Sequence, residues 1–396
     1  MTDMNPYTAL HTPLAGIRGR RVLTPSGLAE AALSFDADGL LSSGEGGGAW
    51  LDAGDLLVLP GIVDLHGDAF ERAIMPRPRV SFPYDNALYD VDRQLLAQGI
   101  TTEFHGVTLS WEGGLRGAAY AERMFDALAR VRAQLGSRHC VHLRFETHHI
   151  DGLELAQRWI QDGKVQFVAL NDHLPGMAKR LGDERKLMQY ADRAECDIDV
   201  FRDRIRAAMS RSGEVAGAMR QLVQSARQAG LAVASHDDPD CATRRYYHQL
   251  GCTVAEFPLN EAAARLARDL GNSVVFGAPN VVRGGSHTGA PSASEMVRQG
   301  LCDVLTSDYY YPAPLAAALQ LAQHEGLARA WSLVSLNPAR AAGLGDRGQL
   351  RPGLRADLIV VDDSIPGLPR VRATVVDGQL RYATHALQAQ TSLLAA

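Results

Sequence analysis

With 396 residues, the chain is long enough for one large α/β domain and a smaller second domain. Its net charge of −5 at pH 7 offers no basic surface, so we expect no nucleic-acid partner. The five scattered cysteines form no C-x-x-C pair, and we find neither a signal peptide nor an apolar run of about 18 residues. We therefore expect reduced thiols, a cytoplasmic location and no membrane partner.

The two ends of the chain share a β-rich pattern. Short alternating segments separated by glycine-rich turns occupy residues 1–58, and similar strand-like segments lie at residues 357–362 and 371–378. Because both ends differ from the long middle region, we predict that they build one small β domain together. We place its N-terminal part at residues 1–58 and its C-terminal part, with a tail, at residues 345–396.

The middle region, residues 59–344, alternates buried strands with amphipathic helices. Eight strand candidates end close to residues 68, 106, 147, 173, 238, 257, 280 and 308. This number and order predict a (β/α)₈ TIM barrel, whose active site lies at the carboxyl ends of the strands. The longest insertion, about residues 177–212, follows the fourth strand and is a candidate lid or subunit contact. We expect a homo-oligomer.

Metal-ligating residue types gather at the predicted strand ends. His66 and Asp68 lie two residues apart on the first strand, so their side chains point the same way. Comparable positions on later strands carry Glu146, His173, His236 and Asp308. One such residue alone is commonly a hydrogen-bonded structural group, but the full set predicts a site for two divalent cations. We expect zinc first, with manganese, iron or cobalt as alternatives.

The roles within this set follow from residue chemistry. Lysines are scarce, and Lys164 precedes the fourth strand, so we expect Glu146 rather than a carboxylated lysine to bridge the two cations. Asp308 is the candidate catalytic residue, because a carboxylate beside the cations can move a proton from the attacking water to the leaving group. Asp172 and Asp237 adjoin ligand candidates, and we expect them to orient imidazoles through hydrogen bonds.

The loop after the seventh strand is the candidate substrate contact. Paired glycines allow backbone N–H groups to approach an anion, and an arginine can bind it with two hydrogen bonds. The residues expected to do so are Asn280, Arg283, Gly284, Gly285, Ser286 and His287. A glycine-rich loop shaped only by packing is the alternative. His105, at the second strand end, is either a substrate contact or a structural histidine.

Several of these segments resemble a known group of enzymes. Residues 337–339 and 353–358 are similar to the usual ending of amidohydrolase superfamily proteins, and residues 59–68, 75–78, 99–102, 235–238, 277–287 and 307–310 resemble the PhnM family. The resemblance implies an amidohydrolase-type TIM barrel with a small β-sandwich domain formed by both termini. It also implies hydrolysis of α-D-ribose 1-methylphosphonate 5-triphosphate in phosphonate metabolism, in which a metal-bridged hydroxide attacks phosphorus and pyrophosphate is released from a small phosphorylated substrate.

The sequence also departs from that family. Gly67 stands where the family typically has threonine, the second strand end around His105 differs, and the insertion near residues 185–190 matches poorly. Two alternatives therefore stay open besides the diphosphatase. One is an amidase, cyclic-amide hydrolase or deaminase that cleaves a C–N bond on the same scaffold, and the other is a non-catalytic barrel.

Overall fold

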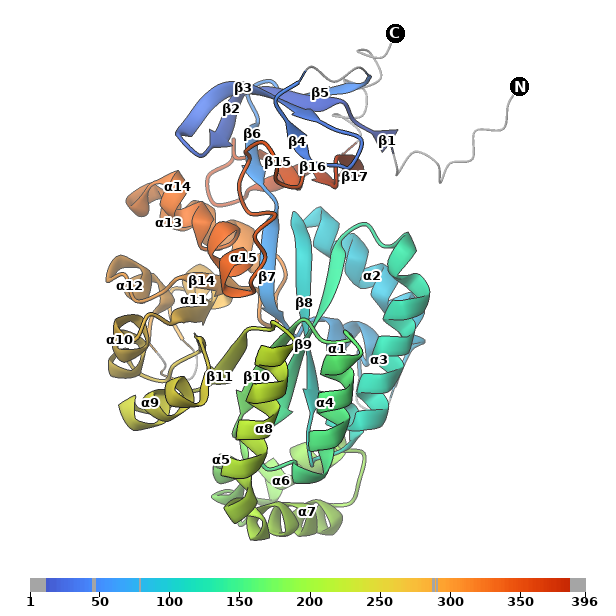
Figure 1. The fold of residues 1–396 in the computed structure, drawn as a ribbon, viewed down its shortest axis with the longest axis vertical. Helices are drawn as coiled ribbons and strands as arrows, with labels where there is room; N and C mark the ends of the chain where they lie inside the picture. The colour runs from blue at the N-terminus through green and yellow to red at the C-terminus, as the bar shows by residue number, and fades with distance from the viewer. Residues whose placement is uncertain (1–11, 45–47, 78–79, 287–288, 290, 385–396) are drawn as a thin grey trace, which may run out of the picture.

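The structure, a computed structural model, describes residues 12–44, 48–77, 80–286, 289 and 291–384. It consists of a barrel and a separate sheet, and Figure 1 shows the sheet at the top, near one end of the barrel. Within the described ranges, no helix has both the length and the apolar character needed to cross a membrane.

The separate sheet is built from both ends of the chain. Its nine described strands run in the order β1 (Thr12–Pro13), β17 (Gln379–Ala383), β16 (Arg370–Val376), β15 (Leu358–Asp362), β6 (Leu57–Pro60), β2 (Gly16–Thr24), β3 (Gly27–Phe35) and β4 (Leu41–Ser42), with β5 (Trp50–Asp52) paired to β2. The antiparallel β6–β15 pair joins the two ends. Apolar residues from both ends form a separate core under this sheet. The prediction of one small β domain from both termini is confirmed.

The barrel contains the eight parallel strands predicted for the middle region. They follow one another in chain order as β7 (Ile62–Gly67), β8 (Ile100–Leu109), β9 (Arg138–Glu146), β10 (Phe167–Asn171), β11 (Val233–His236), β12 (Val254–Glu256), β13 (Ser273–Gly277) and β14 (Val304–Thr306). A parallel bridge between Gly67 and Asp308 joins the last strand region to the first. The prediction of a (β/α)₈ barrel is confirmed.

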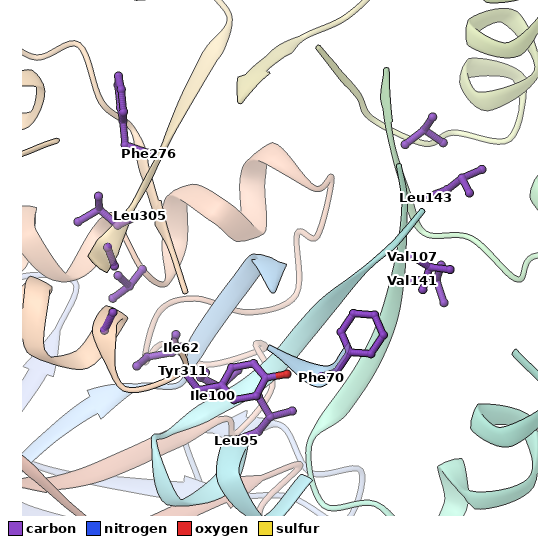
Figure 2. Close-up of a cluster of buried hydrophobic side chains, with 14 of the residues drawn as sticks. Ile62, Phe70, Leu95, Ile100, Val107, Val141, Leu143, Phe276, Leu305 and Tyr311 are labelled. Atoms are coloured by element: carbon purple, nitrogen blue, oxygen red, sulfur yellow. The ribbon is translucent and has the colours of Figure 1, made fainter. Parts of the chain in front are cut away.

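Helices surround the strands and bury their outer faces. The described helices outside the insertion are α1 (Phe70–Ile74), α2 (Tyr84–Ala97), α3 (Ala118–Val131), α4 (Leu153–Gln161), α8 (Val215–Gln228), α9 (Cys241–Leu250), α10 (Glu261–Asp269), α11 (Ala278–Arg283), α12 (Ala293–Arg298), α13 (Ala313–Glu325), α14 (Leu327–Ser332) and α15 (Leu336–Ala341). Four 3₁₀ turns add Gly114–Arg116, Arg132–Gln134, Ile150–Gly152 and Ser212–Glu214. Figure 2 shows part of this core, in which Leu95 of α2 lies near Ile62 and Ile100, register partners in β7 and β8.

The insertion after the fourth strand forms α5 (Leu174–Ala178), α6 (Glu184–Arg193) and α7 (Ile198–Ser210). These helices have a small core of their own, which includes Leu187 and Phe201. In Figure 1 they lie at the end of the barrel opposite the terminal sheet. That end is the one toward which the carboxyl ends of the strands point, so the insertion borders the expected site.

Candidate metal and anion site

Closure of the barrel brings His66, Asp68 and Asp308 together. The backbone N–H of Asp68 donates to the Asp308 carbonyl at 2.7 Å, and the Asp308 N–H donates to the His66 carbonyl at 3.0 Å. One donor atom from each of the three side chains lies within 4.8 Å of the others. Two ends of the barrel sheet, about 240 residues apart along the chain, thus supply one potential cation site.

A second group of donors comes from the neighbouring strands. His173 follows β10, His236 ends β11 and Asp237 follows it, and their donor atoms also lie within 4.8 Å of one another. The Nε2 atoms of His173 and His236 are 4.0 and 3.8 Å from Asp237 Oδ2. The structure therefore places five of the six predicted ligands in two donor groups and adds Asp237 to the second.

Glu146 lies outside both groups. Its buried carboxylate accepts a short hydrogen bond from His173 Nδ1 and a second one from the His173 backbone N–H at 3.3 Å. This contact orients the imidazole and leaves Nε2 facing Asp237. The bridging role stays a prediction, and the geometry gives Glu146 the contacts of a supporting carboxylate.

Glu256, at the end of β12, contacts one histidine of each donor group. It is fully buried, accepts a hydrogen bond from His236 Nδ1 at 3.1 Å and has its other oxygen 3.3 Å from His66 Nδ1. Burial would raise the pKa of this carboxyl, but His142 and His66 hold it well below its usual range. A carboxylate beside both Nδ1 atoms directs both Nε2 atoms toward the cavity, where Nε2 of His236 also accepts a hydrogen bond from Arg144. The sequence placed a strand end here but assigned Glu256 no role.

Two further residues of β9 face this region. His142 donates from Nδ1 to the Leu65 carbonyl at 3.1 Å, and its Nε2 is 3.7 Å from Glu256. Burial lowers the pKa of His142 to about 3, although Glu256 acts in the opposite direction. Arg144 donates to Asp68 Oδ2 at 2.6 Å and to His236 Nε2 at 3.3 Å. Sequence reasoning missed both, although the two-residue period of a strand places them on the same face as Glu146.

Arg144 and the local burial set the charge of the two carboxylates beside His66. Burial would raise the pKa of Asp68, but Arg144 and then His66 hold it well below its usual range. Burial raises the pKa of the Asp308 carboxyl to about 6, although His66 and Arg144 act in the opposite direction. Asp308 is thus the more readily protonated of the two, which suits a group that moves a proton near neutral pH.

Three residues just after barrel strand ends adopt left-handed backbone conformations. The φ angles are 57° at Asp237, 51° at Phe257 and 54° at Asp308. Aspartate tolerates this region, but for a phenylalanine it is strained. The Phe257 ring packs edge-on against His66 and His236, with centroid distances of 5.1 and 5.2 Å. The strained turn thus places an apolar ring against the two imidazoles that contact Glu256.

The donor set fits divalent cations. Asp68 Oδ1 is a buried polar atom without a hydrogen-bond partner among the described residues, and it belongs to the donor group of His66 and Asp308. Imidazole nitrogens and carboxylate oxygens suit zinc, manganese, iron or cobalt alike. Asp172, expected to orient an imidazole, is exposed, and its Oδ1 is 3.3 Å from Nδ1 of His148, which is not one of the predicted ligands.

The loop after β13, which is the predicted substrate contact, borders the same cavity as the donor groups. This cavity, of about 600 Å³, is lined by His66, Asp68, His236, Asp237, Asp308, Arg144, Arg180, Phe257, Pro258, Leu259, Phe276, Gly277, Pro279, Asn280, Arg283, Gly285, Ser286, Gly289 and Tyr309. Arg283 is exposed and donates to the Tyr309 hydroxyl at 3.4 Å. Gly284, at φ 77°, is the cap residue after the last residue of α11 and does not line the cavity. The predicted contact at His287 lies outside the described residues.

Two predicted substrate contacts, of which Asn280 lines the cavity, have structural partners in the fold. Asn280 accepts a hydrogen bond from the Ala293 N–H at 3.0 Å and donates to the Pro291 carbonyl at 3.2 Å, so it joins the two sides of its loop. His105 is fully buried away from the cavity lining, and its Nε2 is 2.8 Å from His139, which in turn contacts Asp92. For His105 the geometry favours the structural alternative.

Comparison with known proteins places the chain among amidohydrolases. Residues 105–382 match the Amidohydrolase family. The chain is 35% identical over 327 residues to the alpha-D-ribose 1-methylphosphonate 5-triphosphate diphosphatase of Escherichia coli (strain K12), covering 80% of this chain and 84% of that protein.

Solved structures agree on the fold. N-isopropylammelide isopropylaminohydrolase from Burkholderia multivorans ATCC 17616 superposes with a TM-score of 0.60 at 18% identity, over 93% of this chain and 98% of that chain. The 5-methylcytosine deaminase from Klebsiella pneumoniae gives 0.60 at 17% identity, again over 93% and 98%. At such identities the similarity shows a common architecture alone.

Proposed function

The chain belongs to the amidohydrolase family and is a metal-dependent hydrolase, and we propose that it cleaves a phosphoanhydride bond. The substrate is a phosphorylated or phosphonylated sugar or a nucleotide-like compound, and the product released is pyrophosphate. The name of the Escherichia coli relative supports a ribose 1-methylphosphonate 5-triphosphate as the first candidate.

One observation carries the choice of phosphorus over carbon. Arg283, Gly285 and Ser286 line the same cavity as the donor groups around His66 and His236. A guanidinium and a glycine backbone suit the oxygens of a phosphate chain. A neutral cyclic amide or heterocycle presents no such anionic group to Arg283, so this wall of the cavity favours a phosphorylated substrate.

The donor groups support two candidate cation sites. His66, Asp68 and Asp308 would hold one divalent ion, and His173, His236 and Asp237 a second. When bound, such ions polarise phosphoryl oxygens and lower the pKa of a coordinated water.

The chain's own residues then supply positioning and proton transfer. Asp308 lines the cavity and accepts the proton of the attacking water, then returns it to the oxygen that leaves with pyrophosphate. Its position beside His66 and Asp68 supports this role, because a carboxylate next to the cations lies within reach of the attacking water. Glu256 keeps His66 and His236 oriented, and Arg283 holds the anionic end of the substrate.

A turnover screen of metal-reconstituted protein tests this proposal. The panel contains the methylphosphonate triphosphate, ribose and nucleoside triphosphates, cyclic amides and aminated heterocycles, with metal content recorded on the same sample. We expect pyrophosphate from at least one triphosphate. Ammonia or a ring-opened acid with the triphosphates intact would overturn the proposal, and so would metal-loaded protein that turns over no triphosphate.

A further inference from the structure

Resting on the proposed function, we propose that Arg180 selects substrates by the length of their phosphate chain. Arg180 belongs to the insertion after the fourth strand and lines the same cavity as Arg144 and Arg283. The three guanidinium groups form an anion path from the donor groups to the cavity wall, which a polyphosphate occupies and a single phosphate does not fill.

The three arginines come from three different elements and have different surroundings. Arg144 lies on β9, is 7% exposed and is paired with Asp68 next to the donor groups. Arg283 ends α11, and Arg180 lies in the turn after α5; both are exposed. Within the described part of the chain, neither of these two pairs with a carboxylate. Each donates a hydrogen bond to a tyrosine hydroxyl, at a distance of 3.4 Å for Arg283 and 2.9 Å for Arg180.

The insertion that carries Arg180 is anchored to the barrel. Glu112, in the loop after β8, is 1% exposed and accepts hydrogen bonds from Arg116 at 3.2 Å and from Arg193 of α6. Arg204 of α7 donates to the Glu112 backbone carbonyl. Because the insertion is attached to this buried carboxylate and packs on its own apolar core, its position relative to the barrel mouth is determined by the fold.

The chemistry of a phosphate chain explains the selectivity. A monophosphate has one anionic centre, so one guanidinium together with cations held by the donor groups would satisfy it. A diphosphate or triphosphate carries anionic oxygens on every phosphorus and can engage several guanidinium groups at once. Since Arg180 and Arg283 have no competing carboxylate among the described residues, their charge is available to the outer phosphates.

Equilibrium binding tests this inference without turnover. Inorganic phosphate, pyrophosphate and tripolyphosphate are titrated calorimetrically into metal-loaded wild type, Arg180→Ala, Arg180→Lys and Arg185→Ala. Arg185 is an exposed arginine of α6 that does not line the cavity, so it controls for loss of positive charge from the insertion. Chelation of metal by the anions is common to all variants and cancels in the ratios between them.

We expect wild type to bind tripolyphosphate more tightly than phosphate. Arg180→Ala should weaken tripolyphosphate binding about tenfold or more, whereas phosphate binding changes less than about twofold. Arg180→Lys should lie between them, because an ammonium keeps the charge without the planar fork. Arg185→Ala should match wild type.

Two results would overturn the inference: an unchanged tripolyphosphate-to-phosphate ratio in Arg180→Ala, or no preference in wild type. The proposed function fails separately. If triphosphates are bound in an Arg180-dependent manner but never hydrolysed, the anion path stands and the reaction assignment falls. If triphosphates are hydrolysed and Arg180→Ala leaves the tripolyphosphate-to-phosphate affinity ratio unchanged, the proposed function stands and only the inference about Arg180 fails.

Discussion

The floor and the outer wall of the cavity are built in opposite ways. On the floor, His66 and Glu256 are at most 1% exposed, and each polar contact is set by another buried group. On the wall, Arg180 and Arg283 are exposed, and a single tyrosine hydroxyl directs each of them. Replacing a buried group of the floor leaves another buried charge without its partner, whereas replacing an exposed arginine of the wall costs little stability. The reaction machinery is therefore harder to alter than the substrate preference.

Replacing Asp308, which lies beside His66 in the cavity, by asparagine should have the largest effect on activity. The amide keeps the shape but cannot accept the proton, so we expect kcat to fall by about 10² to 10⁴. Because the asparagine oxygen can still contact a cation, metal content at saturating metal should stay close to wild type. Steady-state kinetics and elemental analysis on the same sample measure both, and near-normal turnover would remove Asp308 from the proton-transfer role.

Glu256→Gln tests whether one carboxylate supports both imidazoles. The amide offers an N–H₂ group to one of the two Nδ1 atoms, so a favourable contact to His66 or His236 is lost. We expect metal affinity to fall by about 10- to 100-fold, measured by competition with a chelator. The control is Glu261→Gln on the exposed start of α10, and equal affinities in the two variants would contradict the supporting role.

Arg283→Ala sharpens the contrast between floor and wall. We expect kcat/KM for a triphosphate to fall by about 10- to 100-fold, because one charge-assisted contact is lost, and the melting temperature to stay near wild type. The rate for any neutral substrate should not change. Arg298→Ala, an exposed arginine on α12, serves as control. An equal loss for charged and neutral substrates would exclude the anion-binding role.

A change in the terminal sheet should leave both regions of the cavity intact. Asp362 accepts hydrogen bonds from Ser364, Arg372 and Arg370, and the Ser364 contact followed by Arg372 holds its pKa below the usual range. A pKa lowered in the folded state stabilises the fold above the unfolded value of about 3.9 and loses that effect as pH falls.

Asp362→Asn should therefore lower the melting temperature by about 1 to 3 °C at pH 7 and by less near pH 3. Thermal denaturation at both pH values measures the difference. Turnover at pH 7 should match wild type, and a difference that grows as pH falls would contradict the assignment.

Much of the fold and part of the candidate site could be predicted from the sequence. Strand periodicity and the order of elements predicted the barrel, the shared β domain and the strand ends that carry His66, Asp68, His236 and Asp308. The same periodicity on β9 could have identified Arg144. For His105, periodicity could not distinguish a substrate contact at the barrel mouth from a buried structural histidine. The contact with His139, which favours the buried position, exists only in the folded structure.

By itself, the sequence determined the fold class and most of the candidate donor residues, since alternation and spacing are local properties of strands and helices. The tertiary structure decided which donors meet. The bridge between Gly67 and Asp308 closes the barrel and brings the two ends of its sheet to one site. Closure also places Glu256 against two imidazoles, while docking of the insertion on Glu112 brings Arg180 to the cavity. These contacts depend on strand register and on packing between separate elements of the chain, which no local pattern encodes.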